Sequence, residues 1–132
     1  MAKKERTTFP KVWGTEIWMA NTEKYCGKKL ILMEGYRCSM HYHLKKDETF
    51  YIDSGKVLME VGDSVEVMEP GSSVHIGPKV KHRFSGLEKS VIIEISTHHD
   101  ENDSCRDGEL SGEIPDEIKL KYGMKVEDEN IK

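Results

Sequence analysis

The sequence predicts an all-β fold, a sandwich or barrel built from short antiparallel strands. Runs of alternating apolar and polar residues arrive about every eight to twelve residues, and turns rich in Gly, Pro, Asp and Ser separate them. No amphipathic helix pattern lies between these runs, which argues against an α/β architecture. At 132 residues the chain is long enough for one domain with a single core. We therefore expect one domain over 1–132, with the barrel at about 11–97 and a polar loop and tail at 98–132.

The first part of the chain predicts two strands after a polar arm. Residues 1–8 are polar and predict a segment that is either disordered or a loose arm. Alternation then indicates a strand over 15–20 and a second strand over 28–34, in which Lys28 shares a face with two leucines. The ammonium of Lys28 lies either inside the barrel or at the strand end, where it reaches water.

A predicted hairpin near the middle of the chain brings two histidines and a glutamate together. His41 and His43 are separated by one residue, and such a pair points the same way only on a strand. The aromatic and β-branched run 48–52 predicts the next strand, and 45–47 predicts the turn between them. This hairpin returns Glu48 beside the imidazoles. Two imidazoles and a carboxylate form a mixed nitrogen and oxygen site for a divalent metal, which needs one more ligand.

Three further strands follow, and then the candidate for the missing ligand. A Gly-Asp hairpin signal separates strand-like runs at 56–61 and 64–68. A third run at 73–76 places His75 out of phase with its apolar neighbours, so His75 is expected to face away from the core. A Pro-marked turn then leads to His82, which is the candidate fourth ligand.

The most hydrophobic run of the chain, 90–96, predicts the last strong strand. Glu94 lies in this run, on the face opposite Val91, Ile93 and Ile95. A buried carboxylate is seldom without a partner, because an unpaired buried charge is costly. Two orientations stay open, one toward the interior and one toward solvent or a subunit contact.

Beyond residue 97 the composition becomes polar. Adjacent His98 and His99, flanked by acidic residues, could bind a second metal, but neighbours in sequence rarely converge on one ion. A solvated loop is therefore the favoured interpretation. Farther on, Ile114, Ile118 and Tyr122 repeat at helical spacing, which predicts a short helix with one side capping the barrel.

The composition limits which binding partners and which cellular compartment we expect for the protein. The net charge is -4 with 33% charged residues, so no basic patch indicates nucleic acid or an anionic membrane. Apolar stretches such as 30–33 are far too short to span a bilayer. With no apolar signal region, and with Cys26, Cys38 and Cys105 lacking a Cys-x-x-Cys spacing, we expect a cytoplasmic protein with free thiols. Cys38 is either a thiol beside His41 or, as its residue type favours, a core residue.

Aromatic residues near the N-terminus predict a subunit contact. Phe9, Trp13 and Trp18 are bulky apolar groups that the metal site does not need. Exposed aromatic clusters usually mark interfaces, so we expect a homodimer. The alternative is that these rings close one end of the barrel.

The spacing of the candidate ligands resembles a known family. The segment from Gly35 to Gly55 resembles the first motif of the cupin superfamily, and 78–82 resembles its second motif, in which a proline precedes the last ligand histidine. Gly77 and Lys79 depart from that motif, which usually has proline and glycine at these positions. The resemblance implies a double-stranded β-helix, or jelly-roll barrel, that holds one divalent ion (Mn, Zn, Fe, Co or Ni) on His41, His43, Glu48 and His82.

Within the cupins, residues 11–106 look closest to the sugar isomerases, such as D-lyxose isomerase and the cupin part of type II mannose-6-phosphate isomerase. D-lyxose isomerases carry a lysine thirteen residues before the first ligand histidine and a glutamate in a final Glu-x-Ser-Thr strand, and Lys28 and Glu94 occupy these positions. The resemblance implies aldose-ketose isomerisation of a sugar or sugar phosphate, with Glu94 as base and Lys28 as the oxygen-side partner, an order that is reversible. Two alternatives use the same fold: an Fe(II)-dependent dioxygenase, and a metal-dependent sugar-binding or sensing module without turnover.

Overall fold

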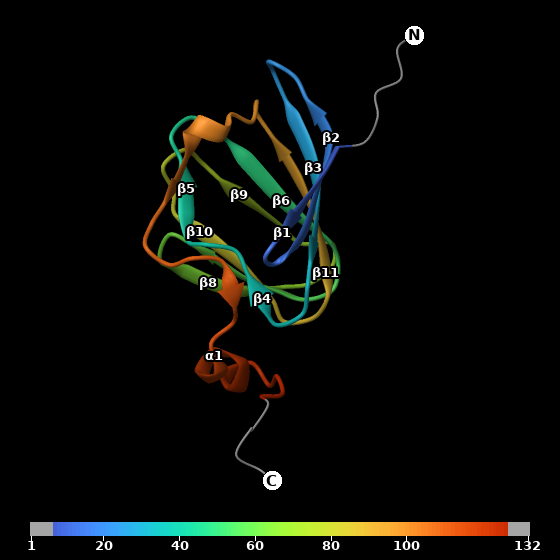
Figure 1. Cartoon of the computed structure of the whole chain (residues 1–132), viewed down its shortest axis with the longest axis vertical. Coiled ribbons are helices and arrows are strands. Elements are labelled where there is room, and N and C mark those ends of the chain that lie inside the picture. The colour runs from blue at the N-terminus through green and yellow to red at the C-terminus, as the bar shows by residue number, and fades with distance from the viewer. Residues whose placement is uncertain (1–6, 127–132) are drawn as a thin grey trace.

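The computed structural model describes residues 7–126, and its strands confirm the all-β prediction. Two antiparallel sheets face each other and form a barrel (Figure 1). The elements are β1 (Thr7–Lys11), β2 (Gly14–Asn21), β3 (Cys26–Leu32), β4 (Tyr36–Arg37), β5 (His41–His43), β6 (Glu48–Ser54), β7 (Val57–Val61), β8 (Ser64–Met68), β9 (Ser73–Ile76), β10 (His82–Gly86), β11 (Ser90–Ser96), the 3-10 helix η1 (Glu101–Asp103), β12 (Ser104–Arg106), β13 (Gly112–Glu113) and α1 (Asp116–Lys121).

The first sheet has the strand order β1-β2-β3-β11-β6-β9. Every second residue of β3 is buried, and the same alternation appears in the first five residues of β6 and through most of β11. Because side chains alternate faces along a strand, this pattern defines the inner face of the sheet. The pairing of β3 with β11 places Glu94 directly opposite Lys28, so both side chains enter the barrel at the same level.

The second sheet brings the histidine-bearing strands together. Its order is β12-β5-β10-β4-β13, and β7 pairs with both β10 and β8. The register sets His82 at the start of β10 opposite His41 on β5, and Arg106 of β12 flanks His41 on the other side. Residues far apart in the sequence therefore meet at one end of this sheet.

An apolar core fills the rest of the space between the sheets. Leu32, Ile52 and Ile92 have 0% exposed surface, and the rings of Phe50 and Phe84 meet edge to face at 5.9 Å. Full burial of one such side chain contributes about 1.5–3 kcal/mol to folding. This core supports the strands that carry the polar residues of the interior.

Gly55 is the last residue of the motif predicted at 35–55, and this position requires glycine for a steric reason. Its φ angle is 89°, a left-handed conformation that glycine adopts without strain. A Cβ atom at this position would lie 2.2 Å from Ser90 Oγ and 2.4 Å from the Lys89 carbonyl oxygen. A side chain cannot fit here, so the return from β6 to β7 depends on glycine.

The strands extend beyond the expected barrel limits of 11 and 97. β1 begins at Thr7 and pairs only with β2, so the last residues of the predicted arm at 1–8 are strand, while residues 1–6 lie outside the described part of the chain. After residue 97, β12 and β13 pair with β5 and β4. A polar edge strand that contains a proline carries little strand signal in its sequence, which is why β1 was not predicted.

A short helix forms near the predicted position. Ile114 is 1% exposed, whereas Ile118 and Tyr122 are half-buried, so the expected cap is anchored mainly by the residue before the helix. Figure 1 shows α1 below the barrel, beyond β4. Within residues 7–126, no helix has both the length and the apolar character needed to cross a membrane.

Candidate metal centre

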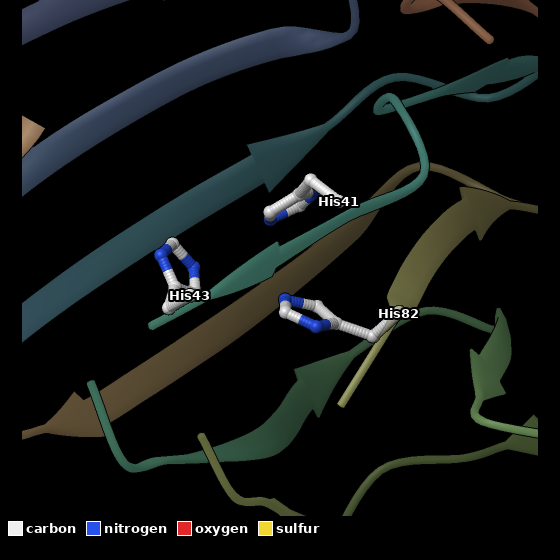
Figure 2. A group of neighbouring side chains, drawn as sticks. All are labelled: His41, His43 and His82. Atoms are coloured by element: carbon white, nitrogen blue, oxygen red, sulfur yellow. The ribbon is translucent and has the colours of Figure 1, made fainter. Parts of the chain in front are cut away.

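Three imidazoles meet inside the barrel. His41 and His43 point to the same side of β5, and the ring of His82 on β10 turns toward them (Figure 2). One nitrogen from each ring lies within 4.8 Å of the others. Within residues 7–126 this is the only such cluster of His, Cys, Asp or Glu that could hold a metal ion. The spacing suits three nitrogen ligands around one cation.

Backbone carbonyls orient two of these rings. Nδ1 of His41 lies 2.8 Å from the Ser39 carbonyl oxygen, and Nδ1 of His82 lies 3.0 Å from the Val80 carbonyl oxygen. Because a carbonyl only accepts, Nδ1 must carry the proton in both rings, which leaves the Nε2 lone pairs for a metal. This is the usual arrangement of metal-binding histidines.

Glu48 lies beside the imidazoles, as the hairpin predicted. Its Oε2 is 3.2 Å from His43 Nε2 and 3.7 Å from His82 Nε2. Both Glu48 Oε2 and His82 Nε2 are buried and make no hydrogen bond among the described residues. Buried polar atoms without partners are costly, and a divalent cation between them would satisfy both. The donor set of three imidazoles and one carboxylate therefore fits a metal ion.

The protonation states also suit metal binding. Burial, together with Lys46, lowers the pKa of His43 to about 2, and burial together with His41 lowers the pKa of His82 to about 3. Burial lowers the pKa of His41 as well. These imidazoles are therefore neutral at physiological pH, as coordination requires. Burial and the nearby carboxylate of Glu94 raise the pKa of Glu48 to about 8, so a bound cation would take the place of a proton there.

The turn between β9 and β10 contains a departure from the cupin motif that the fold accommodates. Lys79 has a φ angle of 68°, the left-handed conformation for which glycine is usual at that motif position. Its N–H donates to the His43 carbonyl at 2.6 Å, which fastens this turn to β5. The sequence change thus leaves the turn geometry intact and costs about 1 kcal/mol relative to glycine.

Lys28 and Glu94 both lie inside the barrel. Their exposed fractions are 2% and 4%, which resolves the orientations that the sequence left open. Each charge is paired: Lys28 Nζ lies 2.8 Å from Glu16 Oε1. Glu94 Oε2 lies 2.6 Å from Lys46 Nζ. The two pairs place two ammoniums and two carboxylates on the cavity wall.

Lys46 is the main residue of the site that sequence reasoning missed. Its position in a predicted turn indicated solvent, yet it is only 3% exposed. The buried Asp103 carboxylate accepts backbone N–H groups from Leu44, Lys45 and Lys46, which folds the turn over the barrel end and directs Lys46 inward. The sequence did indicate that a buried Glu94 would need a cationic partner, but it did not indicate which lysine that partner would be.

His99 also belongs to the site, contrary to the favoured interpretation of a solvated loop. Its side chain is 10% exposed, and its Nδ1 lies near the ammoniums of both Lys28 and Lys46. His98 is exposed, as that interpretation expected. His75 faces away from the core, as predicted, with its side chain 66% exposed.

The remaining sequence candidates are structural. Cys38 is buried, and its thiol accepts a hydrogen bond from the Phe84 N–H. Burial raises the pKa of Cys38 to about 12, so it is a core residue without thiolate character at neutral pH. Cys26 and Cys105 are free thiols, as predicted.

The N-terminal aromatic residues do not form one exposed cluster. Trp13 is 6% exposed and packs edge-on against Phe84 at 5.0 Å, so it closes the barrel instead of contributing to a surface. Phe9 and Trp18 contact each other at 5.0 Å, and the Lys28 ammonium lies 4.6 Å from the centre of the Trp18 ring. The homodimer stays a prediction.

These groups surround one cavity of about 610 Å³. Such a volume suits a small molecule. The lining combines three of the four candidate ligands with both buried ion pairs and with Arg106, and His82 lies behind it with no exposed surface. Its polar and charged members are Lys11, Glu16, Lys28, Ser39, His41, His43, Lys46, Glu48, Glu94, His99, Glu101, Ser104, Arg106 and Ser111.

Comparison with known proteins bears on the same region. A family model described as "Cupin domain" matches residues 29–96. A D-lyxose/D-mannose isomerase of Thermosediminibacter oceani is 30% identical over 109 residues, covering 61% of this chain and 60% of that protein. An oxidoreductase named OpS7, from Beauveria bassiana, is 36% identical over 75 residues, covering 56% of this chain and 22% of that protein. The chain therefore spans less than two thirds of the length of either relative.

Solved structures share the architecture. A variant of Streptomyces PAC13 with uridine superimposes with a TM-score of 0.71 at 11% identity, covering 83% of this chain and 94% of that chain. At this identity the likeness concerns the fold alone. It supports the jelly-roll barrel and says nothing of the substrate.

Proposed function

The chain belongs to the cupin family, and we propose that it is a metal-dependent isomerase that interconverts an aldose and a ketose. The observation that carries the proposal is one cavity lined both by the buried pair of Glu94 with Lys46 and by candidate metal ligands, with His82 completing the histidine cluster just behind the lining. Similarity to the D-lyxose/D-mannose isomerase supports a sugar or sugar phosphate as substrate. The ligands are His41, His43, Glu48 and His82, and the cation is Mn, Zn, Fe, Co or Ni, since this donor set accepts all of them.

In the proposed reaction the metal and the protein would have different roles. A divalent ion, when bound, polarises the substrate carbonyl and offsets the negative charge that develops next to it. The chain must then supply a base that moves a proton between adjacent carbons and a donor for the oxygens. Fixed charges in a cavity screened from water are well suited to this task.

Glu94 has the geometry of the base. Its Oε2 is engaged by the Lys46 ammonium at 2.6 Å and by the Ser96 hydroxyl at 3.2 Å. Among the described residues no hydrogen bond engages Oε1, so this oxygen is available to take a proton from carbon and return it. The two donors on Oε2 fix the carboxylate in one orientation, which keeps Oε1 in place through the transfer.

Lys28 acts on the oxygen side. Its ammonium is held by Glu16 Oε1 at 2.8 Å and lies over the Trp18 ring, so its direction is fixed by two residues of β2. A cation in this position stabilises the developing oxyanion and can donate a proton to it. Lys46 adds a second ammonium to the same wall, a role that the sequence did not suggest.

A second candidate function rests on the OpS7 similarity. That relative is an oxidoreductase, and three histidines with one carboxylate can also hold Fe(II) with open positions for oxygen. Activity that requires both iron and oxygen would favour the dioxygenase. Sugar binding without any product would favour the sensing module.

The proposal is tested by comparing variants of metal-loaded protein under anaerobic conditions, with pentoses, hexoses and their phosphates as substrates. Glu94→Gln keeps the shape of the side chain but cannot take the proton, so it should retain metal and lose about 10²-fold or more in turnover. Lys28→Met should lose turnover in the same way. Glu88→Gln, whose side chain is 56% exposed, is the matched control. Parental turnover in Glu94→Gln would refute the assignment of the base, and loss of metal in both site variants would place them among the ligands.

A further inference from the structure

One nitrogen of His99 contacts two ammoniums on the cavity wall. His99 Nδ1 lies 3.1 Å from Lys28 Nζ and 3.2 Å from Lys46 Nζ. Lys28 comes from β3, whereas Lys46 comes from the turn between β5 and β6. The ring therefore links β3 to the turn between β5 and β6 at the site.

The chemistry of the contacts determines the tautomer of His99. An ammonium can only donate hydrogen bonds, so Nδ1 must accept and the proton must lie on Nε2. Nε2 faces the exposed carboxylate of Glu101, with 3.5 Å between Nε2 and Oε1. Burial lowers the pKa of His99, and the positive charges of Lys28 and Lys46 lower it further, which agrees with a neutral ring.

Other contacts hold the His99 ring in place. Its backbone N–H donates to Asn21 Oδ1 at 2.9 Å, and Asn21 Nδ2 donates to the His99 carbonyl at 3.1 Å. The Trp18 ring meets the imidazole edge-on at 5.0 Å. A histidine fixed at both its backbone and its ring is a rigid acceptor, which can direct flexible lysine side chains.

We propose that His99 is a positioning residue for the reaction proposed above, on which this inference rests. Its Nδ1 holds the ammoniums of Lys28 and Lys46 side by side, so that both donors face the substrate while Glu16 and Glu94 balance their charge. Without this acceptor, mutual repulsion separates the ammoniums and the donor pair loses its alignment. His99 itself touches neither the candidate ligands nor the proposed base in any hydrogen bond of the structure.

The first test needs no substrate. Nitrogen-15 NMR of the full-length protein, labelled in histidine and loaded with Zn(II), reads the protonation of each ring nitrogen. We expect His99 to be neutral at pH 7, with Nδ1 unprotonated and Nε2 protonated. A proton on Nδ1 would overturn it, because that nitrogen could not accept from the lysines. The signal is assigned by its loss in His99→Asn.

The second test uses two nearly isosteric replacements of His99. Asn places an acceptor where Nδ1 stands, whereas Leu places a methyl group there. We expect kcat of His99→Leu to fall about 10-fold or more, with KM changed less than about 3-fold, and kcat of His99→Asn to stay within about 3-fold of the parent. Metal content should be unchanged in both. His98→Leu, at the exposed neighbour, is the matched control and should keep the parental kcat.

The outcomes separate this inference from the proposed function. Equal losses in His99→Leu and His99→Asn, or parental turnover in His99→Leu, would overturn the positioning role while leaving the isomerase proposal intact. A parent protein that isomerises no sugar would refute the proposed function and with it the role in that reaction. The NMR measurement of the His99 tautomer would still decide whether Nδ1 accepts from the two ammoniums.

Discussion

The buried pair of Lys46 and Glu94 allows a quantitative test of the interior electrostatics. The two charged atoms lie 2.6 Å apart, and the exposed fractions of the side chains are 2% and 5%. Burial alone would lower the pKa of Lys46, but the carboxylates of Glu94 and Glu48 together outweigh that effect and raise it. Lys46 is therefore positively charged at neutral pH, and replacement of either residue leaves the other inside the barrel without its partner.

The magnitude follows from this geometry. Coulomb's law at 2.6 Å with an effective dielectric constant of about 20 gives about 6 kcal/mol before desolvation. Removing one member of a buried pair usually costs about 3–5 kcal/mol. Ser96 still donates to Glu94 when Lys46 is replaced, so we expect Lys46→Met to lower the free energy of unfolding by about 3 kcal/mol. In the double variant Lys46→Met/Glu94→Gln, we expect a coupling energy of at least about 1.5 kcal/mol.

The assay is urea unfolding of metal-free protein at pH 7, followed by tryptophan fluorescence, for the parent, both single variants and the double variant. The exposed pair of Lys56 and Glu88 is the matched control, because its charged atoms lie 3.9 Å apart and its side chains are 41% and 56% exposed. Lys56→Met should change the free energy of unfolding by less than about 0.5 kcal/mol. If the changes in the free energy of unfolding of the two single variants sum to within about 0.5 kcal/mol of the change in the double variant, the reasoning is refuted.

Three further predictions concern the metal and the turn. His41→Ala and His82→Ala should each abolish stoichiometric metal in elemental analysis while circular dichroism keeps its β-sheet signal, with His75→Ala as control; full metal content in both would exclude the site. Because the pKa of Glu48 is about 8 without metal, binding near pH 7 should release about one proton, and affinity should fall as pH drops below 8. Calorimetry in buffers of different ionisation enthalpy measures the number of protons released on metal binding. The Glu48→Gln variant should not release this proton. Equal proton release from the parent and from Glu48→Gln would contradict the assignment of the proton to Glu48. Asp103→Ala removes a buried acceptor of three backbone N–H groups and should lower the free energy of unfolding by about 2–4 kcal/mol in urea, whereas a change below about 0.5 kcal/mol would show that the carboxylate does not hold the turn.

The strands, and the residues that strands carry, could be predicted from the sequence. Period-2 alternation sets the face of each side chain, so the shared side of His41 and His43 followed from one intervening residue. The same rule placed Lys28 on the face of Leu30 and Leu32, although it could not say whether the ammonium reached water.

The rest of the site comes from segments without periodicity. Lys46, His99 and Asp103 lie in turns and loops, where the direction of a side chain depends on long-range contacts that the local sequence does not encode. The aromatic residues illustrate the same limit. Trp13 was expected in an exposed aromatic cluster, but it packs edge-on against Phe84, and the next residue, Gly14, lies so close to β3 that a Cβ there would be 1.9 Å from the Ile31 carbonyl oxygen.

The transfer of hydrogen between two carbons of one sugar tests the central claim most directly. D-mannose carrying deuterium at C2 would be incubated with the metal-loaded protein in the absence of oxygen, and the products would be followed by NMR. We predict a ketose in which part of the deuterium has moved to C1, because one base, Glu94, takes and returns the proton, and we predict no such product with Glu94→Gln. A ketose that never carries deuterium at C1, or product that appears only when oxygen is supplied, would contradict the account.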